Sequence, residues 1–238
     1  MENNSLKIKK GNQEELSINV SNLKQKFVQK VLMQVNARTL YHIAEKKTVI
    51  KYSKLPNGQN GEYEPKTNTL HLSKQISNID EFKRVIVHES GHMFDSKDDK
   101  NLATEVIKDM IKTDPKLNST GASMDKLLKE YGTRQLSSRL NNELINTINM
   151  EMQKAFNINI SIPKLGDSPF IAMGIKNHIM DNYMQTDVNK LYALESVEEF
   201  FAEAYSLIVS GNCKSAELLL TYFPESLKLI KQIIESSE

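Results

Sequence analysis

The segment Phe82–Lys97, FKRVIVHESGHMFDSK, places two histidines and a glutamate in an otherwise apolar helical pattern. His88 and His92 are four residues apart, so on an α-helix they lie about 40° from one another on the same face. Two imidazoles with this spacing can bind one Zn²⁺, and Glu89 can reach a water molecule on the same ion. The HExxH pattern therefore predicts a metal-bearing helix with Zn²⁺ as its cofactor.

The apolar residues of this segment indicate that the helix is buried on both flanks of the histidine face. The two apolar walls consist of Phe82, Ile86 and Met93 on one side and of Val87 and Phe94 on the other. A helix that is apolar on both flanks packs inside the protein, where an imidazole without a partner carries a desolvation cost. We therefore favour metal ligands over a solvated pair of histidines or a chance match to the motif.

Two histidines supply only part of a catalytic zinc site, which takes three protein ligands and keeps one position open for water. Outside the motif the chain has other histidines, and none follows the motif at the short spacing of metzincins: His42, His71 and His178. A carboxylate from a second helix is the other common third ligand.

The segment ESVEEFFAEAYS, residues 195–206, supplies such carboxylates. On a helical wheel Glu195, Glu199 and Glu203 form one narrow stripe between apolar neighbours. An acidic stripe with apolar borders is poorly placed for solvent and well placed to face a buried cation. Spacing alone leaves these three glutamates as rival third ligands, and Glu195 is also typical of a helix start, where the helix dipole favours an acidic residue.

HESGHMFD (residues 88–95) and YALESVEEFFAEAY (residues 192–205) together resemble the peptidase domain of anthrax lethal factor and the related clostridial Pro-Pro endopeptidases. That family has HExxHxxD and, further along the chain, a tyrosine seven residues before the ligand glutamate of an EFFAE box. Tyr192 and Glu199 stand at this separation. FPESLKLIKQII (residues 223–234) resembles the terminal helix of the family more loosely.

The resemblance implies a role for each candidate site residue. Glu199 is the third metal ligand, and Tyr192 donates a hydrogen bond to the oxyanion of the tetrahedral intermediate. In the rival interpretation Tyr192 packs at a helix start and His178 is the oxyanion donor. Glu203 is expected to accept the outer N–H of a ligand histidine. Asp95, one turn past the second motif histidine, is expected either to do the same or to be a helix-end aspartate.

These residues together imply a zinc-dependent endopeptidase of the gluzincin type, similar to bacterial secreted or toxin-type proteases. Glu89 is expected to act as general base on a zinc-bound water and to pass the proton to the leaving amine. A protein or peptide substrate would bind in extended form along residues 69–74, which we expect to be an edge strand beside the metal helix. The alternatives are a catalytically inactive lethal factor-like binding module, an intracellular regulatory peptidase and a helical partner-binding protein.

Composition and charge bear on partners and location. The net charge of +1, from 31 basic and 30 acidic side chains, gives no global attraction to nucleic acid. The single cysteine, Cys213, precludes an intramolecular disulfide. Residues 1–20 contain no apolar core of signal-peptide length, and no apolar run reaches the length of a membrane span. The family resemblance implies a secreted protein with a separate delivery component, and a cytoplasmic protein is the alternative.

The hydrophobic patterns predict one α+β, mainly α, domain with a small β-sheet, and the motif together with the resemblance implies a zincin-type metallopeptidase domain with two metal-bearing helices. The domain is expected over residues 21–238, after a flexible N-terminal arm at residues 1–20. Alternating side chains predict strands at 48–53 and 69–74, with a turn-rich loop at 55–68 between them. Besides the motif helix, capped by Asn78 or Asp80, helical spacing predicts helices within 21–47 and at 102–113, 122–131, 138–156, 170–183, 195–211 and 224–234.

Overall fold

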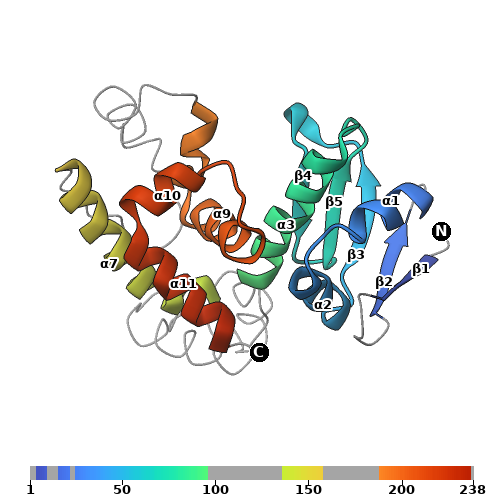
Figure 1. Cartoon of the computed structure of the whole chain (residues 1–238), viewed down its shortest axis with the longest axis horizontal. Helices are drawn as coiled ribbons and strands as arrows, with labels where there is room; N and C mark the ends of the chain where they lie inside the picture. The colour runs from blue at the N-terminus through green and yellow to red at the C-terminus, as the bar shows by residue number, and fades with distance from the viewer. Residues whose placement is uncertain (1–3, 10–15, 22–24, 96–135, 158–187, 237–238) are drawn as a thin grey trace, which may run out of the picture.

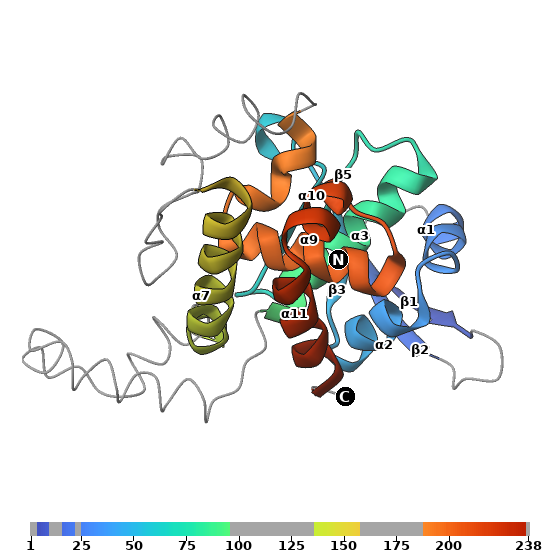
Figure 2. The ribbon, with the colours of Figure 1, turned by 60° about the vertical axis from the view of Figure 1, so that its left-hand side comes forward.

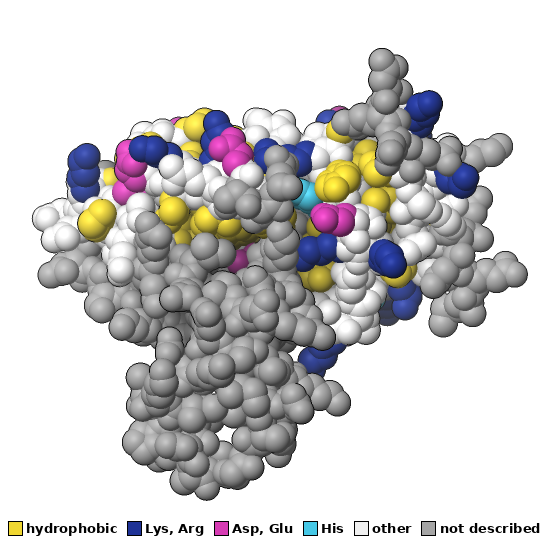
Figure 3. All heavy atoms as spheres, turned by 90° about the horizontal axis from the view of Figure 1, so that it is seen from below, with side chains coloured by type: hydrophobic (Ala, Val, Ile, Leu, Met, Phe, Trp, Pro, Cys, Tyr) yellow, Lys and Arg dark blue, Asp and Glu magenta, His cyan; other side chains and the backbone are white. Residues whose placement is uncertain are grey.

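The computed structural model of the chain describes residues 4–9, 16–21, 25–95, 136–157 and 188–236. These residues form a mixed α and β structure, in which a five-stranded sheet with its helices packs against a group of C-terminal helices (Figure 1). The helices expected at 102–113, 122–131 and 170–183, together with His178, lie outside the described residues. Every helix within the described ranges is too short or too polar to cross a membrane. On the face shown in Figure 3, basic and acidic side chains are interspersed over the described surface.

The sheet has the strand order β1-β2-β3-β5-β4. Its strands are β1 Asn4–Ile8, β2 Leu16–Ser21, β3 Val49–Ser53, β4 Gly61–Glu64 and β5 Thr69–Ser73. The inner strands β2, β3 and β5 are parallel to one another, whereas the edge strands β1 and β4 pair antiparallel with β2 and β5. Because parallel neighbours need a crossover connection, helices α1 (Gln25–Leu32) and α2 (Ala37–Glu45) link β2 to β3.

Residues 4–8 and 16–20 do not belong to the loose arm that we expected over residues 1–20, because they form β1 and most of β2. Leu6 and Ile8 of β1, and Ile18 and Val20 of β2, are buried in the core. β1 has two apolar residues in alternation and β2 has three, including Leu16, and the polar residues around these short runs give the segment the composition of a polar tail. Burial against the rest of the core stabilises the two strands, and the local sequence does not reveal it.

The edge strand beside the helix that carries the HExxH motif is β4 and not the predicted strand at 69–74. That segment forms β5, which lies between β3 and β4. β5 suits an inner position because Leu70 and Leu72 are fully buried. β4 falls within the segment expected to be a turn-rich loop. The strand was not predicted there because its four residues, GEYE, contain no apolar run that signals a strand.

Helix α3 occupies the centre of the molecule. It spans Ile79–Asp95 and lies between the sheet and α9, Val197–Ser210 (Figure 1). It contacts β4 and β5 on one side and α9 on the other. The buried apolar residues form one core, which continues from the sheet through α3 to the C-terminal helices. α3 and α9 are therefore fixed against one another by packing on both sides.

Capping residues set where these two helices begin and end. Asn78 accepts the backbone N–H of Asp80 at 2.8 Å before α3. Ser196 accepts the backbone N–H of Glu199 at 3.1 Å, so α9 begins two residues later than predicted. α9 ends at Gly211, whose φ of 72° is a left-handed conformation that favours glycine.

Further helices complete the C-terminal part: the 3₁₀ helix η3 Val188–Leu194, α7 Leu136–Phe156, α10 Ala216–Tyr222 and α11 Pro224–Ser236. α11 packs against α7 and α9 (Figure 2). Glu151 on α7 accepts the backbone N–H groups of Glu225 at 2.7 Å and Ser226 at 3.1 Å, in the first turn of α11. A buried carboxylate there satisfies donors that have no partner within the helix. This contact holds α7 and α11 together, and both helices also contact α9.

Candidate metal centre

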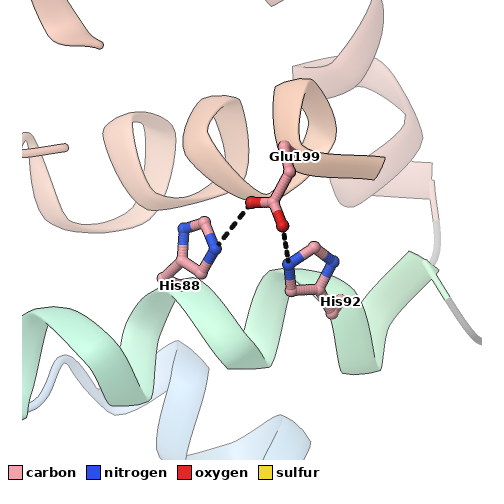
Figure 4. A group of neighbouring side chains, drawn as sticks. All are labelled: His88, His92 and Glu199. Carbon is pink, nitrogen blue, oxygen red and sulfur yellow. Dashed lines mark ion pairs between the residues drawn. The ribbon is translucent and has the colours of Figure 1, made fainter. Parts of the chain in front are cut away.

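Side chains from α3 and α9 meet at one point between the two helices (Figure 4). His88 Nε2 lies 3.1 Å from Glu199 Oε2, and His92 Nε2 lies 3.5 Å from Glu199 Oε1. The helices approach this closely because of Gly91 on α3, where a Cβ would lie 2.7 Å from the Cα of Ala202. The spacing of the two helices therefore brings the glutamate within reach of both imidazoles.

The geometry of these three residues fits a bound metal ion. Their ligand atoms all lie within 4.8 Å of one another. Ligands at about 2.0–2.1 Å from a tetrahedral ion are separated by about 3.3 Å, close to the two distances given above. Among the described residues, no donor is aligned for a hydrogen bond to the buried Glu199 Oε2, although His88 Nε2 lies 3.1 Å away. A cation would satisfy this oxygen, so the group could hold a metal ion.

The electrostatics of the group favour positive charge between the helices. Burial opposes the charged form of His88, yet the carboxylates of Glu199 and Glu203 raise its pKa to about 10. Burial also opposes the Glu199 carboxylate, yet the two imidazoles beside it hold its pKa well below its usual range. The carboxylates thus stabilise a cation at this point, whether it is a protonated imidazole or a metal ion.

Glu203 orients the first histidine. Its Oε1 accepts the Nδ1–H of His88 at 3.0 Å, and its Oε2 accepts the backbone N–H of Ser215 at 2.8 Å. Burial would raise the pKa of Glu203, but the His88 side chain lowers it, so Glu203 is a carboxylate with no proton to donate. In neutral His88 the proton therefore lies on Nδ1, and the Nε2 lone pair faces Glu199.

Glu89 lies beside these ligands and is not one of them. It is buried, with 6% of its surface exposed, against the edge strand β4. It accepts the backbone N–H of Tyr63, and a Cβ at Gly61 would lie 2.7 Å from its Oε1. Burial raises the pKa of Glu89, and the imidazoles of His92 and His88 oppose the rise. A buried carboxylate next to a metal group is suited to accept a proton.

Tyr192 borders the same cavity from η3. The centroid of its ring lies 5.6 Å from that of His88. Burial, followed by the charge of Glu199, raises the pKa of Tyr192 above its ordinary value, so the phenol keeps its proton and can donate a hydrogen bond. The rival oxyanion donor, His178, lies outside the described residues, and the structure does not compare the two.

Asp95 and Glu198 border the cavity at the C-terminal end of α3. Within the described part of the chain no hydrogen bond joins Asp95 to His92, and Asp95 is the last residue of α3, which is the second of the two roles expected of it. Burial raises the pKa of Asp95 to about 7, and the charge of His92 opposes the rise. Glu195 precedes α9 and does not belong to the group of possible ligands.

A cavity of about 540 Å³ adjoins His88, His92 and Glu199, which we call the metal group. The cavity lies between β4 with the loop before it, α3, η3 and the start of α9. Some residues that border this cavity have no signal in the sequence: Gly61, Tyr63 and Lys214. They reach the cavity through the pairing of β4 with β5 and through the path of the loop after α9. Neither feature follows from the spacing of side chains along the chain.

No protein-family model, curated protein or solved structure matches the chain. The geometry defines a class of site, a His–His–Glu group between two helices that could hold a metal ion. A function for the chain therefore has to be inferred from this site and from the resemblance of its two sequence segments.

Proposed function

We propose that the chain is a zinc-dependent endopeptidase whose metal is held by His88, His92 and Glu199. The observation that supports this most strongly is the meeting of these side chains from two helices that are distant in the sequence (Figure 4). Two imidazole nitrogens and one carboxylate oxygen are a typical donor set for catalytic zinc, whereas Mg²⁺ and Ca²⁺ prefer oxygen ligands. We include in the same proposal a zincin-type fold and a secreted, toxin-type role, because the two sequence segments resemble lethal factor.

The chain's own residues would perform the proton transfers of peptide hydrolysis. When bound, zinc lowers the pKa of its water towards about 7 and polarises the scissile carbonyl. Glu89 accepts a proton from the attacking water and delivers it to the leaving amine, a role usually worth about 10²–10⁴ in rate. Tyr192 donates a hydrogen bond to the oxyanion, and the loss of such a donor typically costs about 3–4 kcal/mol.

An extended peptide can add to the outer edge of β4. On the side of β5, the C=O of Asn60 accepts the N–H of Ser73 at 2.9 Å. Because the hydrogen bonds of a strand alternate in direction, the backbone groups of Gly61 and Tyr63 face away from β5. The N–H of Tyr63 is bound by Glu89, so this edge lies directly beside the general base. Main-chain pairing here would hold a substrate across the metal group.

Zinc analysis combined with peptide profiling tests the proposal. The purified protein should contain stoichiometric zinc and should cleave members of a peptide library, as read by mass spectrometry. Glu89→Gln should keep the zinc and lose hydrolysis, since it removes the base and leaves the ligands. Stoichiometric zinc without cleavage of any peptide would indicate the inactive binding module, and a protein that binds no zinc would overturn the proposal.

A further inference from the structure

The N-terminal end of the cavity, measured along α3, is basic. Arg84 lies one turn before His88, and Lys214, in the loop after α9, borders the same cavity. Both act on Glu81, in the first turn of α3: its hydrogen bond with Arg84 is the main cause of its lowered pKa, and the charge of Lys214 contributes. The two cations therefore lie at the same end.

The opposite end of the cavity is acidic. Asp95 is the last residue of α3, three positions after His92, and Glu198 on α9 also borders the cavity. Burial raises the pKa of Asp95, and the charge of Glu198 adds to the rise, so the two carboxyl groups are neighbours. The metal group lies between the basic and the acidic end. A peptide that crosses it meets opposite charges on its two sides.

Lys214 is the better placed of the two cations to bind a substrate. Arg84 donates from Nε and Nη2 to the two carboxylate oxygens of Glu81, at 2.9 and 2.5 Å. The Lys214 ammonium lies 4.6 Å from the centroid of the Tyr192 ring, and no carboxylate of the described residues forms an ion pair with it. A ring face attracts an ammonium group and leaves its N–H donors able to bind another partner.

The direction of β4 decides which side of a substrate meets Lys214. Asn60, just before β4, donates from its side chain to Glu81 in the first turn of α3 at 2.9 Å. The backbone N–H of Tyr63, within β4, donates to Glu89, which is two turns further along α3. β4 thus runs in the same direction as α3, away from the basic end. Antiparallel pairing is more stable per residue than parallel pairing. A peptide added to β4 would therefore run the other way, with its C-terminal side at Lys214.

We propose that Lys214 selects substrates that carry a carboxylate on the C-terminal side of the scissile bond. This inference rests on the proposed peptidase function and adds a substrate class to it. The ammonium group binds the carboxylate through a charge-assisted hydrogen bond, while the Tyr192 ring holds the lysine at the cavity wall. The carboxylate belongs either to an aspartate or glutamate side chain or to the C-terminus of the substrate.

Matched peptides test the preference in two assays. The peptides are identical except for Glu, Gln or Lys at the positions that follow the scissile bond, and each is made with a free and with an amidated C-terminus. The first assay measures kcat/KM for cleavage. The second measures binding of fluorescent peptides to the zinc-loaded Glu89→Gln protein by anisotropy, which requires no hydrolysis. We expect a preference for Glu over Gln of about tenfold, the size typical of one hydrogen bond to a charged group.

Variants of Lys214 assign the preference to this side chain. Lys214→Gln should abolish the preference and Lys214→Glu should reverse it in favour of Lys, with zinc content and unfolding midpoint unchanged. Lys190→Gln is the matched control, because Lys190 on η3 pairs with Glu217 at 3.1 Å and does not border the cavity. This variant should keep the preference of the wild type.

The outcomes separate the inference from the function on which it rests. Cleavage at equal rates both for Glu and Gln and for free and amidated C-termini, an unchanged preference in Lys214→Glu, or a preference for acidic residues before the scissile bond would each overturn the inference and leave the peptidase intact. Equal rates for Glu and Gln, together with faster cleavage of peptides that have a free C-terminus, would support the inference and identify the terminal carboxylate as the ligand. If no peptide is cleaved, yet the Glu89→Gln protein binds the Glu peptides through Lys214, the carboxylate site stands and the peptidase function falls.

Discussion

At the scale of single residues, His88 is held in one orientation by a carboxylate that does not belong to the ligand group. Glu203 accepts its Nδ1–H at 3.0 Å and is itself fixed by the backbone N–H of Ser215 at 2.8 Å. A partner of this kind selects the tautomer of a ligand histidine and raises the basicity of the ligating nitrogen. The affinity of the site for zinc should therefore depend on a residue that does not touch the ion.

Glu203→Ala should weaken zinc binding about 10–100-fold, because His88 loses the acceptor that orients it. Competition with a chromophoric chelator measures the dissociation constant. Glu217→Ala is the control, since Glu217 is an exposed glutamate of α10 that pairs with Lys190 away from the metal group. An unchanged dissociation constant in a folded Glu203→Ala protein would show that this carboxylate does not tune the ligand.

Asp95 makes the stability of the metal-free protein depend on pH. Burial raises its pKa from the ordinary 3.8 to about 7. The folded state thus binds this proton more tightly than the unfolded state, and stability falls as the pH rises from about 4 to about 7. Above that range the full penalty applies, at most about 4 kcal/mol for a shift of this size.

Asp95→Asn should remove this penalty. In the presence of a chelator, the variant should unfold at nearly the same temperature as the wild type near pH 4 and at a higher temperature at pH 8. Thermal unfolding at both pH values measures the difference between the two proteins, in which the titration of the histidines largely cancels. A difference that does not grow between pH 4 and pH 8 would contradict the burial of a charged Asp95.

The ligand residues could be predicted from the sequence to the extent that helical spacing determines them. His88 and His92 are fixed relative to one another by a single turn of helix. The wheel of α9 left three glutamates in one stripe, and the family resemblance indicated Glu199 among them. The packing of α9 on α3 brings Glu199 to both Nε2 atoms and Glu203 to the outer nitrogen of His88. Lys214 lies in a loop, where no periodicity indicates the direction of its side chain.

At the scale of elements, the longer helices could be predicted, whereas the short helices η3 and α10 and the strands β1, β2 and β4 could not. The helix expected at 138–156 is α7, Leu136–Phe156, because its apolar residues repeat over many turns. β4 contacts α3 through a glycine and a backbone N–H, and such contacts leave no pattern of side chains in the sequence. β1 and β2 have five and six residues, and partners distant in the sequence supply the burial that stabilises them.

Gly61→Ala should lower the rate of hydrolysis and leave zinc binding unchanged. A Cβ at this position would lie 2.4 Å from Val85 Cγ1 and 2.7 Å from Glu89 Oε1, so the strand or Glu89, the proposed general base, must shift. A displacement of about 1 Å can cost about 100-fold in rate. Measurements of kcat/KM and zinc content separate the two effects.

Glu64→Ala is the matched control for this substitution. Glu64 lies on the same strand, and its side chain contacts His71 and Thr67 instead of Glu89. The Glu64→Ala protein should therefore hydrolyse peptides at the rate of the wild type. A Gly61→Ala protein that keeps the full rate would show that β4 does not position the general base.

At the scale of the whole molecule, the metal group joins two parts of the chain. The sheet and the helices packed on it hold α3 with its two histidines, and the C-terminal helices hold α9 with Glu199 (Figures 1 and 2). The two imidazoles and the carboxylate converge only when α3 and α9 pack together, because Gly91 must approach Ala202 closely. An ion bound at this point should therefore stabilise the folded state and have little affinity for the unfolded chain.

Removal of the metal should consequently lower the unfolding temperature. At a free zinc concentration about 100-fold above the dissociation constant, binding contributes about 2.7 kcal/mol, equivalent to about 5–10 °C for a protein of this size. Scanning calorimetry with and without a chelator measures the shift. Glu199→Gln should unfold at a temperature that responds to neither zinc nor chelator, since it removes the ligand that connects α9 to α3. If the chelator still lowers the unfolding temperature of this variant, the stabilising ion lies elsewhere, and the pairing of the two helices does not depend on it.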